Sequence, residues 1–228
     1  MAFSSEKREV ESAHDGPHQG QPVLAAGEPL ERATAAMVLV HGRGASARDI
    51  LTLAPELARP GVAFRAPQAR GGAWYPKSFL APIAENEPWL GSALAAVGGV
   101  LRRLGEAGLP PERTILLGFS QGGCLVLEFA ARNARRYGGV AGLSGGLIGP
   151  PGTPRDYPGS LAGTPVFLGC DERDPHVPAE RVRETAKVME GMGATVTARL
   201  YRGLGHTIGP DELEAVRAML ESLEESPR

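Results

Sequence analysis

Cysteine and surplus charge are both scarce in this chain of 228 residues. Its 2 cysteines are too few for a disulfide scaffold or for a metal site built from four thiolates. The 24 Lys and Arg residues nearly balance the 26 Asp and Glu residues, so the formal net charge is only −2 at pH 7. Because no basic surplus is available to neutralise a phosphate backbone, we expect no nucleic-acid partner.

Long apolar runs are also missing. The longest, such as residues 35–40, fall far short of the ~20 residues that a membrane-spanning helix needs. A secretory signal is disfavoured as well, because charged residues interrupt the stretch 6–11. We therefore expect a cytoplasmic monomer or homodimer with no membrane span. Residues 1–20 are polar and mixed in charge, which predicts a disordered extension without a catalytic role.

Glycine and proline, by contrast, are abundant, with 31 and 20 residues and no repeating period. Such a composition is typical of many tight connections between regular elements. Short apolar runs that predict strands lie at residues 23–26, 36–40, 62–66, 114–119, 139–143, 165–170 and 195–201. Helical patterns lie at residues 90–104, 121–136, 178–189 and 210–223.

The alternation of strands and helices predicts the fold class. Strands separated by helical segments of this length imply β-α-β crossovers and a mainly parallel sheet with helices on both faces. The first two apolar runs flank a turn-prone sequence at residues 27–29, so we expect them to form an opening hairpin. No repeat or linker divides the chain, which predicts an α/β protein with a single domain over residues 21–228.

One strand leads directly into a reactive sequence. Residues 114–119 run through the pattern G-x-S-x-G, centred on Ser120, into a helix, which is the context of a nucleophile elbow. The flanking glycines remove side chains that would collide in the tight turn, so the serine is held strained and exposed. We predict that Ser120 is a nucleophile and that the backbone N–H of Gln121 donates to a developing oxyanion.

A serine nucleophile needs a general base. Two of the five histidines, His14 and His18, lie in the predicted extension and are set aside. His206 follows the last strand in a glycine-rich loop that could deliver an imidazole to Ser120, and the order Ser, acid, His is the one expected in α/β-hydrolases. The sequence therefore predicts His206 as the base.

The acid that orients the base should follow the strand at residues 165–170. Asp171 and Asp174 both lie there. Asp171 is close to the strand end and suits an Asx-type turn, whereas Asp174 lies farther into the loop. The residues alone leave the choice between the two aspartates open.

Four segments together resemble the phospholipase/carboxylesterase family of α/β-hydrolases, which includes the acyl-protein thioesterases and small bacterial carboxylesterases. The similarity extends from about residue 21 to the last helix. The elbow is common to all α/β-hydrolases, but its Ser-Gln-Gly-Gly extension and the Asp-x-x-Val-Pro sequence are more specific. These segments are Val40-His-Gly-Arg-Gly44, Gly118-Phe-Ser-Gln-Gly-Gly123, Asp174-Pro-His-Val-Pro178 and Gly205-His206.

The resemblance implies an α/β-hydrolase fold and a triad of Ser120, Asp174 and His206, with no metal and no cofactor. It also implies an oxyanion hole made by the backbone N–H groups of Gln121 and Arg43. His41 is then a structural residue of the loop that carries Arg43. Position 43 is often aliphatic in the thioesterases, so the guanidinium is a departure that is expected to alter the entrance to the site.

Aromatic residues make up only 5% of the chain, yet four of them gather within sixteen residues: Trp74, Tyr75, Phe79 and Trp89. Such side chains bury large areas wherever they fall, so a core role is one interpretation. The other is that residues 71–76 form a loop lining a substrate pocket beside Ser120. The sequence does not separate the two.

These observations predict a serine carboxylesterase that hydrolyses a small-molecule ester of short to medium acyl chain through an acyl-enzyme. A thioesterase or lysophospholipase acting on acylated proteins or lipids uses the same residues and is the alternative. A dienelactone-hydrolase-like enzyme is disfavoured because Ser120 stands where that group usually carries cysteine. A non-catalytic binding protein with this fold is disfavoured because all three triad residues are present.

Overall fold

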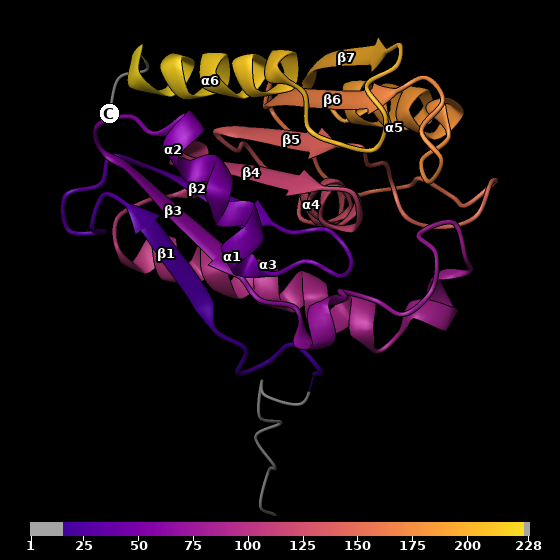
Figure 1. Cartoon of the computed structure of the whole chain (residues 1–228), viewed down its shortest axis with the longest axis horizontal. Coiled ribbons are helices and arrows are strands. Elements are labelled where there is room, and N and C mark those ends of the chain that lie inside the picture. Colours follow the sequence, from indigo (N-terminus) through magenta and orange to yellow (C-terminus); the bar gives the residue numbers. More distant parts are fainter. Residues whose placement is uncertain (1–15, 226–228) are drawn as a thin grey trace, which may run out of the picture.

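The computed structural model describes residues 16–225, and within them seven strands form one sheet with the order β1-β3-β2-β4-β5-β6-β7 (Figure 1). Strand β1 pairs antiparallel with β3, and every other pair is parallel. The strands are β1 Val23–Gly27, β2 Ala35–Val40, β3 Val62–Pro67, β4 Thr114–Phe119, β5 Gly139–Leu143, β6 Pro165–Asp171 and β7 Thr195–Tyr201. The predicted α/β class with a mostly parallel sheet is therefore confirmed.

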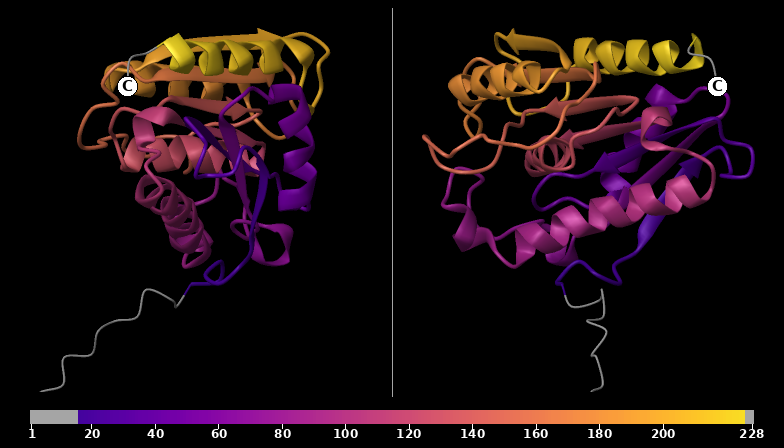
Figure 2. Two further views of the ribbon diagram at one scale, coloured as in Figure 1. Left: turned by 90° about the vertical axis from the view of Figure 1, so that its left-hand side faces the viewer. Right: turned by 180° about the vertical axis from the view of Figure 1, so that it is seen from behind.

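Helices cover both faces of the sheet, as the two views of Figure 2 show. One apolar layer lies between the sheet and helices α1, α2 and α6, and the other between the sheet and α3, α4 and α5. No helix within the described part of the chain is both long and apolar enough to cross a membrane. The helices are α1 Ala47–Ile50, α2 Ala54–Leu57, α3 Trp89–Glu106, α4 Gln121–Arg132, α5 Ala179–Gly191 and α6 Pro210–Glu225.

The expected opening hairpin is wrong. Strand β1 pairs with β3, and β2 lies between β3 and β4 at the centre of the sheet. All six residues of β2 are apolar and buried, as suits a parallel strand covered on both faces, whereas β1 is only partly buried and lies at an edge. Pairing depends on which neighbours complete the core, and a local turn signal does not reveal them.

The predicted strand bounds at β4, β5 and β7 agree with the structure, whereas one helix is shorter than expected. Helix α4 ends at Arg132, four residues before the predicted end at residue 136. Asn133 leaves the helical conformation, with φ −119° and ψ 47°, and its side-chain amide donates to the carbonyl of Phe129 at 2.9 Å. This side-chain cap replaces the next turn of helix.

Of the disordered extension predicted for residues 1–20, residues 1–15 lie outside the described residues, and the prediction is wrong at His18, which packs on the fold. His18 is only 2% exposed. Its backbone N–H donates to Ser92 Oγ at 2.9 Å, and its Nε2 donates to the carbonyl of Trp74 at 2.8 Å. The segment around His18 is polar and has no apolar periodicity, so the packing of His18 on the fold could not be predicted from the sequence.

Candidate active site

The predicted reactive residues meet at the carboxyl edge of the sheet. Ser120 follows β4, Asp174 lies in the loop after β6, and His206 lies in the loop after β7. The loop after β2 carries Arg43 next to the elbow, because Val40 is in register with Gly118 of β4. Loops beyond the carboxyl ends of parallel strands are the usual place for ligand sites in open α/β sheets.

The turn that carries Ser120 is strained and tightly packed. Ser120 has φ 55° and ψ −118°, a conformation that costs free energy in any residue with a side chain. A Cβ at Gly118 would lie 2.1 Å from the carbonyl oxygen of Gly122, and a Cβ at Gly122 would lie 2.1 Å from that of Val40. Glycine is therefore required at both positions, which lets the strand turn sharply into α4 and expose the serine.

A continuous series of hydrogen bonds links the three side chains. His206 Nε2 lies 2.8 Å from Ser120 Oγ, and His206 Nδ1 lies 2.7 Å from Asp174 Oδ2. Because an ionised carboxylate only accepts hydrogen bonds, the proton lies on Nδ1 and leaves Nε2 free to accept from the serine hydroxyl. The imidazole is 19% exposed and the Asp174 carboxylate 0%, so the serine faces the pocket while the acid is shielded.

Asp174 is held in its ionised form by three donors. Burial by itself would raise its pKa, but hydrogen bonds from His206 and from the N–H groups of His176 and Val177 outweigh it and hold the pKa of Asp174 below its ordinary value. The two backbone donors lie 2.8 and 3.0 Å from Oδ1. The loop thus fixes one carboxylate oxygen and leaves the other for the imidazole.

The competing carboxylate, Asp171, contacts the same loop at another point. Its Oδ1 accepts from the N–H of Arg173 at 2.7 Å, in an Asx-type turn, and its Oδ2 accepts from the N–H of Gly205 at 3.0 Å. Hydrogen bonds from Gly205 and Arg173 lower the pKa of Asp171. Asp171 therefore anchors the residue next to His206, while Asp174 contacts the imidazole itself.

The two residues expected to supply backbone donors lie beside the serine. Gln121 is the first residue of α4, so its N–H has no acceptor within the helix. Arg43 lies in the loop whose Gly42 approaches the elbow so closely that a Cβ there would be 3.4 Å from Ser120 Cβ. Both residues line the same cavity as Ser120.

The cavity has a volume of about 510 Å³, within the usual range for small-molecule sites. Ser120 and His206 lie in its wall, and Tyr75 and Phe79 give it apolar surface. Trp74 and Trp89 do not line it: the ring of Trp74 packs 5.0 Å from that of His41, and Trp89 packs 5.4 Å from that of His18. The other lining residues are Arg43, Pro76, Lys77, Ser78, Gln121, Cys124, His176 and Val177.

Similarity to known proteins identifies the family of the chain. The model of the Phospholipase/Carboxylesterase family matches residues 23–224. The chain belongs to this family of α/β-hydrolases. It is accordingly a hydrolase with the α/β-hydrolase fold. A solved phospholipase/carboxylesterase from Dyadobacter fermentans has 43% sequence identity and a TM-score of 0.84, over 88% of this chain and 96% of that one.

Curated relatives of the hydrolase include acyl-protein thioesterases of fungi. Acyl-protein thioesterase 1 of Gibberella zeae is 37% identical over 120 residues, which span 50% of this chain and 50% of that protein. Acyl-protein thioesterase 1 of Emericella nidulans is 26% identical over 220 residues, which span 84% of this chain and 91% of that protein. The first alignment thus covers half of the relative, and the second nearly all of it.

The hydrolase has two further histidines near the site. His41 is 0% exposed; its Nδ1 donates to the carbonyl of Gly42 at 2.8 Å, and its Nε2 accepts from the N–H of Ala69 at 3.1 Å. Burial lowers its pKa, so His41 is a neutral packing residue of the loop. His176 is exposed at the rim of the cavity, and its ring lies edge-on to that of His206 at 4.7 Å.

Neither cysteine of the hydrolase resembles a nucleophile. Cys124 and Cys170 are both buried and free. Burial raises the pKa of each thiol to about 12, so neither forms a thiolate near neutral pH. Within residues 16–225, no three His, Cys, Asp or Glu side chains gather into a group that could hold a metal ion.

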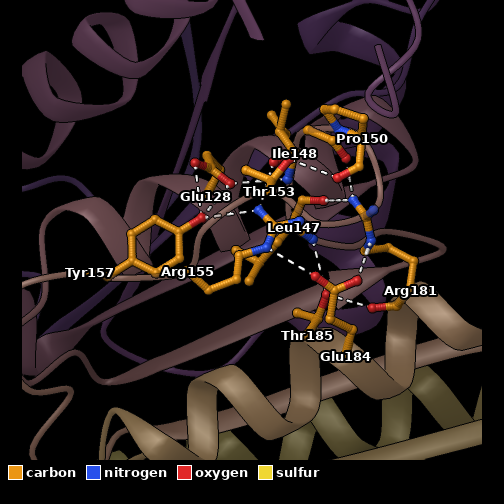
Figure 3. A network of polar contacts seen from close by, with 11 residues as sticks. Glu128, Leu147, Ile148, Pro150, Thr153, Arg155, Tyr157, Arg181, Glu184 and Thr185 are labelled. Carbon is orange, nitrogen blue, oxygen red and sulfur yellow. Dashed lines mark hydrogen bonds and ion pairs between the residues drawn. The ribbon is translucent and has the colours of Figure 1, made fainter. Parts of the chain in front are cut away.

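A network of polar contacts surrounds Glu128 and Arg155 (Figure 3). Glu128 of α4 is 1% exposed and accepts from the N–H of Ile148 at 3.0 Å and from the Tyr157 hydroxyl at 3.1 Å. The next residue, Gly149, donates its N–H to the carbonyl of Phe79 at 2.7 Å. The segment that carries the network is therefore bonded to the backbone of Phe79, whose side chain lines the cavity.

Part of this site could not be predicted from the sequence. Lys77 and Ser78 line the cavity without belonging to any motif. The side chain of Arg43, expected at the entrance, donates to the backbone carbonyls of residues 75–77. Contacts to a carbonyl do not depend on the identity of the residue that carries it, so no pattern in a single sequence could have revealed them.

Proposed function

We propose that this hydrolase is a serine carboxylesterase that cleaves esters of short to medium acyl chain through Ser120, His206 and Asp174. The observation that carries the proposal is the series of short hydrogen bonds from Ser120 Oγ through the imidazole to the shielded Asp174 carboxylate, in the wall of a cavity of suitable size. Nucleophile, base and orienting acid are then all within hydrogen-bond distance.

In the proposed reaction, Ser120 Oγ attacks the ester carbonyl carbon while its proton moves to His206 Nε2. The tetrahedral intermediate collapses, the imidazolium returns the proton to the leaving alcohol, and an acyl-enzyme remains. Water then attacks the acyl-enzyme with His206 as base, which releases the carboxylic acid and restores the serine. Ionised Asp174 keeps the imidazole in the required tautomer and stabilises its charged form.

The negative charge of the tetrahedral oxygen needs donors that are already in place. We assign this role to the N–H groups of Gln121, at the start of α4, and of Arg43, in the adjacent loop. Donors of this kind act where charge develops, and removing one typically costs ~10²- to 10³-fold in rate. The oxyanion hole is thus expected to contribute as much as the proton transfers.

Thioester hydrolysis is the second candidate, because the relatives of Gibberella zeae and Emericella nidulans are named acyl-protein thioesterases. The same serine would attack a thioester carbonyl with the same base and the same oxyanion donors. The leaving thiolate needs less protonation than an alkoxide. A lysophospholipid ester would use the same steps. These substrates differ only in the leaving group and acyl chain.

The test is a series of p-nitrophenyl esters from acetate to laurate, run beside the matching acyl thioesters. Wild type is expected to hydrolyse the shorter oxygen esters, and Ser120→Ala to lose at least about 10³-fold in kcat. Ser160 is exposed and is not among the residues that line the cavity, so Ser160→Ala is the control and should retain full activity. An inert wild type would refute the esterase proposal, and an active Ser120→Ala would refute the nucleophile.

A further inference from the structure

Two side chains bind the segment of chain that lies above the elbow. The guanidinium of Arg43 donates to the carbonyl oxygens of residues 75–77 at 2.7, 3.1 and 2.7 Å. The side-chain amide of Gln121 donates from Nε2 to the carbonyl of Tyr75 at 2.8 Å, and its Oε1 accepts from the N–H of Trp74 at 2.8 Å. The Tyr75 carbonyl oxygen therefore accepts one hydrogen bond from each of the two side chains.

The segment that receives these bonds is itself fixed. Trp74 is 0% exposed and Tyr75 1% exposed. The indole N–H of Trp74 donates to the carbonyl of His41 at 2.8 Å. At the other end, the N–H of Lys77 donates at 2.8 Å to the side chain of Asn86, which is also fully buried. Residues 74–77 thus form a rigid support rather than a mobile loop.

The loop that carries Arg43 is hydrogen-bonded on both sides of this residue, from His41 Nδ1 to the carbonyl of Gly42 and from the N–H of Gly44 to the carbonyl of Gly72, each at 2.8 Å. Arg43 lies between Gly42 and Gly44, and Gly44 has a φ of +78°. The Arg43 side chain is largely exposed, where a guanidinium could bind water instead. The guanidinium instead donates all three of its hydrogen bonds to residues 75–77. These bonds orient the backbone at residue 43, because the planar guanidinium has few degrees of freedom once it is bound.

We propose that the side chains of Arg43 and Gln121 are positioning groups that set the separation of their own backbone N–H groups by sharing the carbonyl of Tyr75. This inference rests on the proposed function, in which those two N–H groups bind the oxyanion. The segment 74–77 is then a third component of the oxyanion hole, which touches no reacting atom. Oxyanion donors need such support because a displacement of about 1 Å can cost ~10²-fold in rate.

The first test is Arg43→Met, which keeps an unbranched stem and removes the donors. Because the N–H acts mainly on the transition state, kcat for p-nitrophenyl butyrate should fall roughly 10- to 100-fold with little change in KM. Arg43→Lys, with a single ammonium, should recover part of the loss. Arg48→Met, at an exposed position on helix α1, is the matched control and should behave as wild type.

A second readout separates oxyanion geometry from general damage. An alkyl trifluoromethyl ketone accepts Ser120 Oγ at its carbonyl carbon, the serine proton moves to His206, and the carbonyl oxygen becomes an oxyanion. The matching alkane, with no carbonyl, binds only in the cavity. In Arg43→Met the ketone should bind weaker by the same factor as kcat falls, whereas the affinity for the alkane should not change. Equal loss of both would overturn the inference.

The shared carbonyl is tested by a double-variant cycle. Loss of either side chain leaves the Tyr75 carbonyl with one of its two donors, so Arg43→Met and Gln121→Met should not act independently. The loss of kcat in the double variant should be smaller than the product of the two single losses. A loss equal to the product would show that Tyr75 does not couple the two groups.

The outcomes also distinguish this inference from the proposed function. An inert wild type refutes the esterase itself. If the wild type is active and Ser120→Ala inactivates it, the esterase proposal holds. If kcat is then unchanged in Arg43→Met, the positioning role of Arg43 is overturned. Circular dichroism and thermal melting of each variant show whether the fold is intact.

Discussion

Replacement of the buried carboxylate of Glu128 is expected to destabilise the hydrolase strongly. Glu128 lies on α4, is 1% exposed, and accepts from the N–H of Ile148 and the hydroxyl of Tyr157 (Figure 3). It also accepts from the guanidinium of Arg132. Ile148 is 0% exposed, so its N–H has no access to bulk water once Glu128 is truncated to alanine.

The cost follows from the groups left without partners. A buried N–H that loses its acceptor costs about 1–3 kcal/mol, and the half-buried Tyr157 hydroxyl adds about 1 kcal/mol. Arg132 is 33% exposed and can turn to water, so it adds little. With the space left by the deleted side chain, Glu128→Ala should lose about 3–5 kcal/mol of unfolding free energy.

Glu128→Gln is the matched control, because its amide oxygen still accepts from Ile148 and Tyr157, whereas its NH2 group cannot accept from Arg132. We expect a loss of about 1 kcal/mol for this variant. Urea unfolding followed by circular dichroism measures both, with m unchanged and the midpoint shifted. Glu128→Ala should also raise KM for p-nitrophenyl butyrate, because the network holds Phe79. A Glu128→Ala loss below about 1 kcal/mol, or equal losses in both variants, would refute the reasoning.

Two further predictions concern the elbow and a buried acid. In Gly122→Ala the new Cβ would lie 2.1 Å from the carbonyl oxygen of Val40 and 2.6 Å from that of His41, so kcat/KM should fall at least about 100-fold. Gly105→Ala is the control and should keep the wild-type kcat/KM, because its new Cβ has nothing within 4 Å. A wild-type kcat/KM in Gly122→Ala would contradict the packing argument. Burial raises the pKa of Glu212 to about 7. The folded state therefore binds its proton more tightly than the unfolded state, so wild-type stability should fall by up to about 3 kcal/mol as pH rises from 5 to 8. Glu212→Gln should reduce this slope in urea unfolding, and an unaltered slope would exclude Glu212 as its source.

Much of the fold could be predicted because strand and elbow signals are local. The apolar runs of β4 and β5 give the bounds of these strands to the residue, since a strand buried on both faces needs continuous apolar side chains. The pairing of β1 with β3 was not predicted, because it joins residues forty positions apart through backbone hydrogen bonds that carry no side-chain signature. The docking of His18 on Trp74 escaped prediction for the same reason.

The candidate site divides in a similar way. Sequence by itself determined the elbow at Ser120, because only glycine fits beside a serine in so tight a turn, and it placed His206 in the loop after the last strand. The residues alone left Asp171 and Asp174 open, and only the family resemblance favoured Asp174. The tertiary structure shows the physical difference: Asp174 contacts the imidazole, whereas Asp171 binds the N–H of Gly205. Asp171 ends strand β6 and Asp174 lies three positions later in the following loop, so which carboxylate reaches the histidine depends on how the loops after two adjacent strands meet. The same holds for Arg43: its position was visible in the chain, but its three carbonyl partners exist only once the fold brings residues 75–77 beside it.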